Sequence, residues 1–196
     1  MSLRDWQAAL LKILPNPEQT SHVLEQQTGQ LTRRERDHLT GLSLSTGLDV
    51  TRDVQIWWRQ ARLQIAIPFS MRLIQRLELQ KIVAQYQKRP CTTLFFLREA
   101  QAFSEFIQEN PEAPTLLRDM VQFECALHMA RLRQAGAGSH PTQEFSPSDT
   151  LELPLTYCPE DCMTALLQNT PLPGSSPDGV TIQMNSHWPR LWSRVR

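Results

Sequence analysis

Two cysteines four residues apart have the types and spacing of a metal site. Cys158 and Cys162 stand in the segment YCPEDC, and two thiolates at this spacing can hold one side of a zinc ion. A structural zinc site needs two further ligands, and His187 is the only histidine downstream of the pair. The pattern therefore favours two free thiols near a turn, and we expect no metal in this chain.

Glu124 and His128 form a second candidate pair, one helical turn apart. No second Glu–His pair exists to complete a di-metal site, and a salt bridge or a solvated helix edge is the more common role. The sequence also lacks a phosphate-binding glycine loop, a Gly-x-Ser-x-Gly elbow and a His-Glu-x-x-His pair. We therefore predict a non-catalytic chain. A small metalloenzyme built on Glu124, His128 and the two cysteines is the alternative.

Composition narrows the class of partner. Twenty basic residues balance twenty acidic ones over 196 residues, so no net charge draws the chain onto nucleic acid or an anionic membrane. No apolar run approaches the roughly 20 residues that span a bilayer, and the segment MSLRDWQ lacks the apolar region of a signal peptide. We expect a cytoplasmic protein with reduced cysteines, and neither nucleic acid nor a membrane as partner.

The segment that must organise the fold is the helix predicted over residues 115–133. Its apolar residues recur at steps of four and three and form one stripe: Leu116, Met120, Phe123, Leu127 and Ala130. A second apolar helix is predicted over 92–108. The turn at 109–111 should make the two an antiparallel hairpin.

Further amphipathic helices are predicted upstream, over residues 2–14, 17–27, 31–42, 50–66 and 69–86. Thr32 and Glu35 should form a capping box. In 50–66, with Thr51 as cap, we expect Val54 and Ile65 to face the core together with one of the adjacent tryptophans. Because Trp57 and Trp58 project about 100° apart, both are candidates for a partner interface, with a wide core as the alternative.

The helical period ends near residue 136. A linker is predicted over 136–149, separating a helical domain (1–135) from a small strand-containing domain (150–196). Strands are expected over 151–155, 180–184 and 189–195, with a helix over 159–168 and Pro154 at a sheet edge or a bulge. The predicted fold class is mainly α: an N-terminal helix bundle followed by a small C-terminal α+β domain with about three short strands.

Short strands with an uncovered edge can bind an extended peptide by strand addition. From Val180 onward the chain has three arginines and no acidic residue, so Arg190 and Arg194 should meet acidic side chains of the peptide. Alternation should direct Val180, Ile182 and Met184 onto the helices. The candidate peptide-binding residues are Val180, Thr181, Ile182, Gln183, Met184, Arg190, Leu191, Trp192 and Arg194.

A longer pattern covers the two central helices. LREAQAFSEFI, a short proline-bearing turn and P-x-LLRDM-x-x-FE-x-A-x-x-x-A resemble the helical partner proteins, once labelled DNA-binding domains, of multinuclear non-heme iron-dependent oxidative enzymes. The resemblance is clearest over residues 92–133 and extends over 57–77. Within this family the chain most resembles the partner subunits of the methanobactin and 3-thiaglutamate pathways.

The resemblance implies a function in the biosynthesis of ribosomally made, modified peptides. In such systems the iron enzyme modifies peptide cysteine, while the small partner binds the leader of the precursor peptide and docks on the enzyme. The iron ligands lie on the enzyme, so no cofactor is expected here. The expected function is therefore a non-catalytic accessory subunit of a hetero-complex. A helical DNA-binding regulator is the alternative. The balanced charge and the absence of a basic helix-turn-helix signature argue against it.

Overall fold

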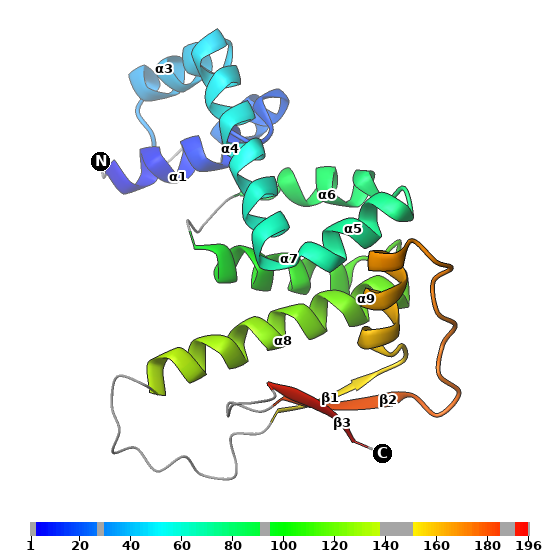
Figure 1. The fold of residues 1–196 in the computed structure, drawn as a ribbon. Coiled ribbons are helices and arrows are strands. Elements are labelled where there is room, and N and C mark those ends of the chain that lie inside the picture. The colour runs from blue at the N-terminus through cyan, green and yellow to red at the C-terminus, as the bar shows by residue number, and fades with distance from the viewer. Residues whose placement is uncertain (1–2, 27–29, 91–94, 138–150, 185–190, 196) are drawn as a thin grey trace. The chain divides into compact units, whose positions relative to one another are not determined.

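The computed structural model of the chain describes residues 3–26, 30–90, 95–137, 151–184 and 191–195, without the side chains of 133–137 (Figure 1). Within these residues lie nine α-helices, one 3-10 helix and a three-stranded antiparallel sheet near the C-terminus. The predicted fold class is therefore confirmed. The chain forms two compact units, residues 1–61 with 81–93, and residues 62–80 with 94–196. No helix in the described segments is both long and apolar enough to cross a bilayer.

The first unit contains short amphipathic helices around an aliphatic core. Ala9, Ile13 and Leu39 are fully buried in this core. Glu35 accepts a hydrogen bond from the N–H of Thr32 at 2.8 Å, which confirms the expected capping box. The elements are α1 (Leu3–Ile13), the 3-10 helix η1 (Pro17–Gln19), α2 (Thr20–Gln26), α3 (Arg33–Ser43), most of α4 (Thr46–Ala66) and most of α6 (Gln80–Gln87).

Helix α4 buries a different face from the one that its apolar residues predicted. It begins at Thr46, so the expected cap Thr51 lies inside the helix, where its hydroxyl donates to the carbonyl of Gly47 at 2.8 Å. The residues expected in the core are exposed: Val54, Trp57, Trp58 and Ile65. The buried residues of α4 are instead Leu48, Arg59, Arg62, Leu63 and Ala66.

Two arginines of α4 are buried because their guanidinium groups have partners. Within the first unit, Arg59 Nη1 donates to the carbonyl oxygens of Gln87 at 3.0 Å and Arg89 at 2.7 Å, near the end of α6. Within the second unit, Arg62 Nη2 lies 3.0 Å from a carboxylate oxygen of the buried Glu99. Burial of a charge costs free energy unless it is paired, and these partners reverse the usual outward placement of arginine.

The single helix expected over residues 69–86 is two helices, α5 (Pro68–Arg76) and α6. Glu78 adopts φ = 56°, in the left-handed region, and the N–H of Leu79 donates to the carbonyl of Ile74 at 2.9 Å. This geometry ends an α-helix, and glycine usually supplies the left-handed residue. The apolar period continues across the break and no glycine marks it, so the sequence did not reveal it.

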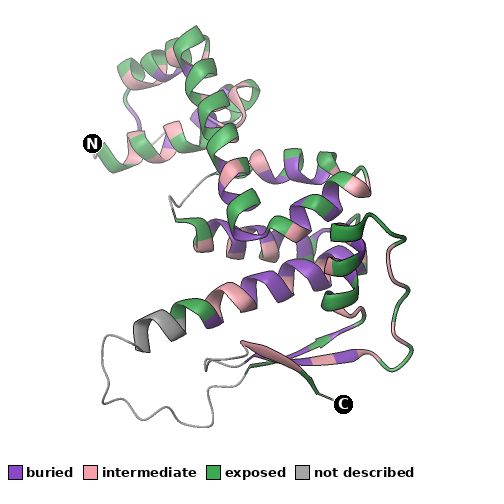
Figure 2. Ribbon diagram, viewed as in Figure 1, coloured by how far each residue is buried: buried purple, intermediate pink, exposed green. Residues whose placement is uncertain are grey.

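In the second unit, α7 (Phe96–Glu109) and α8 (Thr115–Ala137) form the expected antiparallel pair (Figure 1). The expected stripe of α8 is in the core, with Phe123 fully buried. Burial extends beyond this stripe to Leu117, Val121 and Ala126, because α8 packs against α5 and α7 on one side and the sheet on the other (Figure 2).

The sheet has the order β1-β2-β3. Strands β1 (Leu151–Leu155) and β2 (Val180–Met184) and helix α9 (Pro159–Gln168) have the predicted bounds. Strand β3 covers Trp192–Val195, and residues 189–190 of the strand expected there lie outside the described residues. Pro154 lies in the edge strand β1, as predicted. The sheet shares a core with Phe123 and Ala126 of α8. The expected linker over 136–149 lies outside the described residues except for its first two, which continue α8.

Candidate functional site

The sheet has one edge that suits an added strand. Among the described residues, β2 pairs with a strand on each side, whereas β1 and β3 each pair with β2 alone. Pro154 interrupts the outer edge of β1, because proline has no N–H to donate. Strand β3 contains no proline. A peptide that extended this sheet would therefore lie along β3.

Asp119 of α8 also binds the backbone just after the end of β1. Its Oδ2 accepts hydrogen bonds from the N–H groups of Thr156 at 2.7 Å and Tyr157 at 2.9 Å. Burial raises the pKa of Asp119, and the two backbone hydrogen bonds oppose that rise. Asp119 thus fixes the end of β1 on α8.

Asp119→Ala is expected to lower the free energy of unfolding by about 1–3 kcal/mol, because it leaves two backbone N–H groups without their acceptor. Asp119→Asn keeps one acceptor oxygen of the same size and should cost less. Urea unfolding monitored by circular dichroism measures both. The exposed Asp37 of α3 provides the control, since Asp37→Ala should change stability by less than about 0.5 kcal/mol. Equal stability of wild type and Asp119→Ala would contradict the structural role.

The residues expected to bind peptide divide between the sheet core and its edge. Val180, Ile182 and Met184 are buried against the helices, as expected, and Thr181 and Gln183 are half-buried on the other face. Since the β2 backbone is paired on both sides, these five residues support the edge instead of forming it.

Strand β3 carries the side chains that a ligand on this edge would meet. The half-buried Trp192 packs edge-on against Phe123, with ring centroids 5.4 Å apart and planes at 90°. Arg194 is exposed, and Leu191, just before the strand, is half-buried. Arg190 lies outside the described residues. The structure thus brings Trp192 and Arg194 together on one short strand.

The candidate interface tryptophans lie on the first-unit part of α4. Trp57 and Trp58 are 60% and 50% exposed, with ring centroids 4.9 Å apart and planes at 73°. Val50 and Val54, at one helical turn's spacing, are also exposed. We call these four residues the α4 stripe. Both tryptophan side chains face outward, whereas the sequence predicted at least one of them in the core.

Glu124 has a buried structural role, in place of the metal ligand or solvated helix edge considered for it from the sequence. One carboxylate oxygen accepts from the N–H of Phe69 at 2.9 Å, and the other accepts from the N–H and the hydroxyl of Ser70, each at 2.6 Å. These N–H groups belong to the first turn of α5, so Glu124 caps that helix from another one. Burial raises its pKa, and the hydrogen bonds from Ser70 and Phe69 oppose the rise.

Cys125 and Cys162 have the environment of core residues, and Cys158 is half-buried. Burial, together with the charge of Glu124, raises the pKa of Cys125 to about 12 and that of Cys162 to about 11. Both thiols are therefore protonated at neutral pH, and the thiolate is the form that binds metals. In the described part of the chain, no three histidine, cysteine or acidic side chains gather as a metal site requires.

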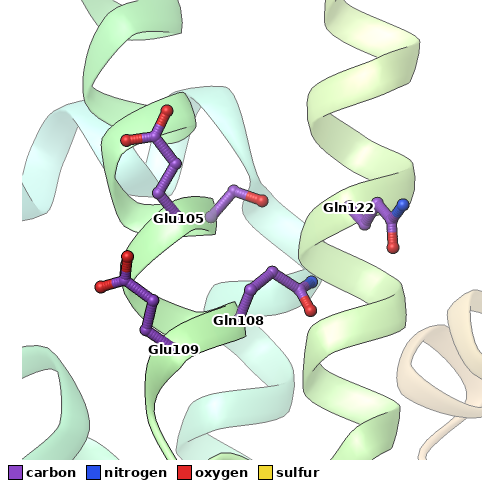
Figure 3. A pocket seen from close by; sticks show the side chains of 5 residues that line it. Glu105, Gln108, Glu109 and Gln122 are labelled. Carbon is purple, nitrogen blue, oxygen red and sulfur yellow. The ribbon is translucent and has the colours of Figure 1, made fainter.

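A hollow of about 490 Å³ lies between α7 and α8. Glu105, Gln108 and Glu109 line it from α7, and Gln122 lines it from α8 (Figure 3). It is open to solvent, whereas small-molecule sites are usually enclosed. We assign it no ligand.

Comparison of this chain with models of protein families, with curated proteins and with solved structures gave no match. A functional assignment accordingly depends on the edge of β3, the α4 stripe and the sequence pattern of residues 92–133.

Proposed function

We propose that this chain is a non-catalytic accessory subunit that binds the leader of a ribosomally made precursor peptide and docks on an iron-dependent oxidative enzyme. The enzyme modifies cysteine of that peptide, as in the methanobactin or 3-thiaglutamate pathways. The observation that carries the proposal is the edge of β3, which presents Trp192 and Arg194 on a strand that pairs, among the described residues, with β2 alone. The sequence pattern of residues 92–133 supports it. In this proposal the complex is cytoplasmic and the iron is bound by the enzyme.

The short edge makes side-chain contacts necessary for affinity. A strand of four residues directs the backbone groups of alternate residues outward, which offers an added strand about four hydrogen bonds. Each contributes about 0.5–1.5 kcal/mol net, whereas association costs about 4–15 kcal/mol in lost freedom of motion. Backbone pairing alone therefore gives weak binding. Contacts to the side chains of β3 must supply the remainder.

The α4 stripe is the surface that we assign to the enzyme. Exposed tryptophans in edge-to-face contact present a large apolar area with few rotatable bonds, and tryptophan is enriched among the residues that dominate binding energy at protein interfaces. The α4 stripe belongs to the first unit and the edge of β3 to the second, so variants of the two surfaces can be tested separately.

Co-expression with an iron-dependent oxidative enzyme encoded beside this chain is expected to yield a stable complex on size-exclusion chromatography. Changing both tryptophans of the α4 stripe to arginine should weaken that complex at least about thirtyfold, the equivalent of about 2 kcal/mol. The melting temperature of the isolated variant should stay near that of the wild type, because both side chains are exposed.

Gln7→Arg, at an exposed position of α1, is the matched control and should leave the complex intact. A chain that never co-purifies with the enzyme and remains a monodisperse monomer would contradict the subunit assignment. Full retention of the complex by the double tryptophan variant would instead place the contact with the enzyme elsewhere.

A further inference from the structure

We propose that the edge of β3 selects an extended peptide in which an acidic and an apolar side chain stand two residues apart, the acid beside Arg194 and the apolar residue beside Trp192. This inference rests on the proposed function, because it specifies the peptide that the edge binds. The partner is an extended peptide segment, and the edge recognises it by an acidic and an apolar side chain at alternate positions.

The strand register places both side chains of β3 on one face of the sheet. Trp192 lies opposite Met184, and Arg194 lies opposite Ile182. Met184 and Ile182 are buried against α8, and cross-strand partners share a face. Trp192 and Arg194 therefore project toward the side of the sheet on which α8 packs. A strand added beside β3 would continue the same alternation.

The two positions differ in what they can bind. Trp192 rests on Phe123 and is half-buried, so its uncovered side offers a fixed apolar surface. Arg194 is exposed, and among the described residues it forms no ion pair. The sequence has no acidic residue after Asp178, whereas Arg190, Arg194 and Arg196 all follow it. A carboxylate from a ligand would thus meet positive charge without local competition.

The opposite face of β3 supplies no comparable selection. Ser193 lies opposite Gln183 and Val195 opposite Thr181, so this face carries small or uncharged side chains. Peptide residues on that side should tolerate any polar side chain. Selection therefore depends on alternate residues only, and a shift of the acid by one position moves it to the wrong face.

The test uses the full-length protein and fluorescein-labelled nonapeptides with threonine flanks. The first probe has the core Val-Thr-Glu-Thr-Val, which places an apolar residue two positions from the acid in either strand direction. Its isomer Val-Glu-Thr-Thr-Val has the same composition with the acid on the other face. The core Val-Thr-Lys-Thr-Val tests the contribution of the negative charge, and the core Thr-Thr-Glu-Thr-Thr tests that of the apolar residues. Fluorescence anisotropy at low salt gives the Kd of each.

The first probe should bind about fivefold more tightly than each of the other three, as expected for an exposed ion pair and a modest apolar contact. Its advantage over the lysine probe should decrease at high salt. Arg194→Glu should reverse that preference, and because Arg194 is exposed this variant should fold like the wild type. Arg194→Gln should reduce the preference for the glutamate probe over the lysine probe.

Equal affinity for all four probes, or binding of none, would overturn the inference. An N-methylated form of the first probe distinguishes this failure from failure of edge binding. If all four bind equally and N-methylation at alternate residues abolishes binding, strand addition is supported while side-chain selection is wrong. Co-purification with the enzyme tests the subunit assignment independently of these probes.

Discussion

Glu124→Ala is expected to lower the free energy of unfolding by about 3–5 kcal/mol. The substitution removes the acceptor of three hydrogen bonds, two of them from N–H groups in the first turn of α5. Ser70 is fully buried, so water does not replace the lost acceptor without opening the packing between α5 and α8. Buried donors left without partners each cost about 1–3 kcal/mol. Urea unfolding measures the change.

The exposed Glu105 of α7 is the matched control, and Glu105→Ala should change stability by less than about 0.5 kcal/mol. Glu124→Gln preserves the size of the side chain but presents an amide NH₂ to donors, so its stability should lie between those of alanine and wild type. Unchanged stability of Glu124→Ala would show that Glu124 does not cap α5.

The raised pKa of Glu124 also determines how stability depends on pH. Because burial raises the pKa in the folded state above its usual 4.5, the folded chain binds more protons than the unfolded chain in the interval between the two values. The contribution of Glu124 is therefore complete below about pH 4.5 and is lost as pH rises through the folded-state pKa. The stability difference between wild type and Glu124→Gln should narrow over that interval. A widening difference would contradict the sign of the shift.

Phe123→Ala is expected to cost about 3–5 kcal/mol, the usual range for removal of a fully buried aromatic side chain. Phe123 is the largest side chain through which α8 contacts the inner face of the sheet, beside Ala126, and it packs against Trp192 and the apolar residues of β1 and β2. The substitution should destabilise the sheet as well as the helix packing. The midpoint of thermal unfolding should therefore fall, and the strand signal in circular dichroism should decrease.

Phe96→Ala is the control for Phe123, since Phe96 begins α7 and is 42% exposed. Phe123→Ala should also weaken binding of the Val-Thr-Glu-Thr-Val probe more than that of Thr-Thr-Glu-Thr-Thr, because Trp192 loses the ring against which it packs. A Phe123→Ala variant as stable as Phe96→Ala would mean that the sheet does not depend on α8.

The fold was predictable where apolar side chains are buried and polar side chains are exposed. Alternation in 151–155 and 180–184 gave β1 and β2 with their correct bounds, since each strand has one buried face. Helix α4 shows the opposite case, because the sequence does not reveal that Arg59 and Arg62 find buried partners on distant segments. Those partners determine which face of α4 is buried, and they leave its tryptophans exposed.

The candidate site was only partly predictable for a related reason. Arg194 and Trp192 were expected at a peptide-binding edge, but the order of strands assigns that edge to β3 and places β2 at the centre. Strand order depends on which strands meet in space, and local alternation carries no information about it. Asp119 and Glu124 had a usable signal, since each interrupts a helix that is otherwise apolar around most of its circumference. An acidic residue in such a place indicates a buried acceptor.

The central position of β2 affects how this protein is synthesised. β1 leaves the ribosome well before β2, and neither it nor β3 has another partner among the described strands. Until β2 has emerged, Phe123 and the inner side of β1 remain in water, and the nascent chain presents them to chaperones and to other copies of itself. Translation of β2 therefore decides whether the chain completes this core or aggregates. Slow translation between β1 and β2 should lower the yield of folded protein, whereas the helices of the first unit, built from nearby segments, can fold before this point.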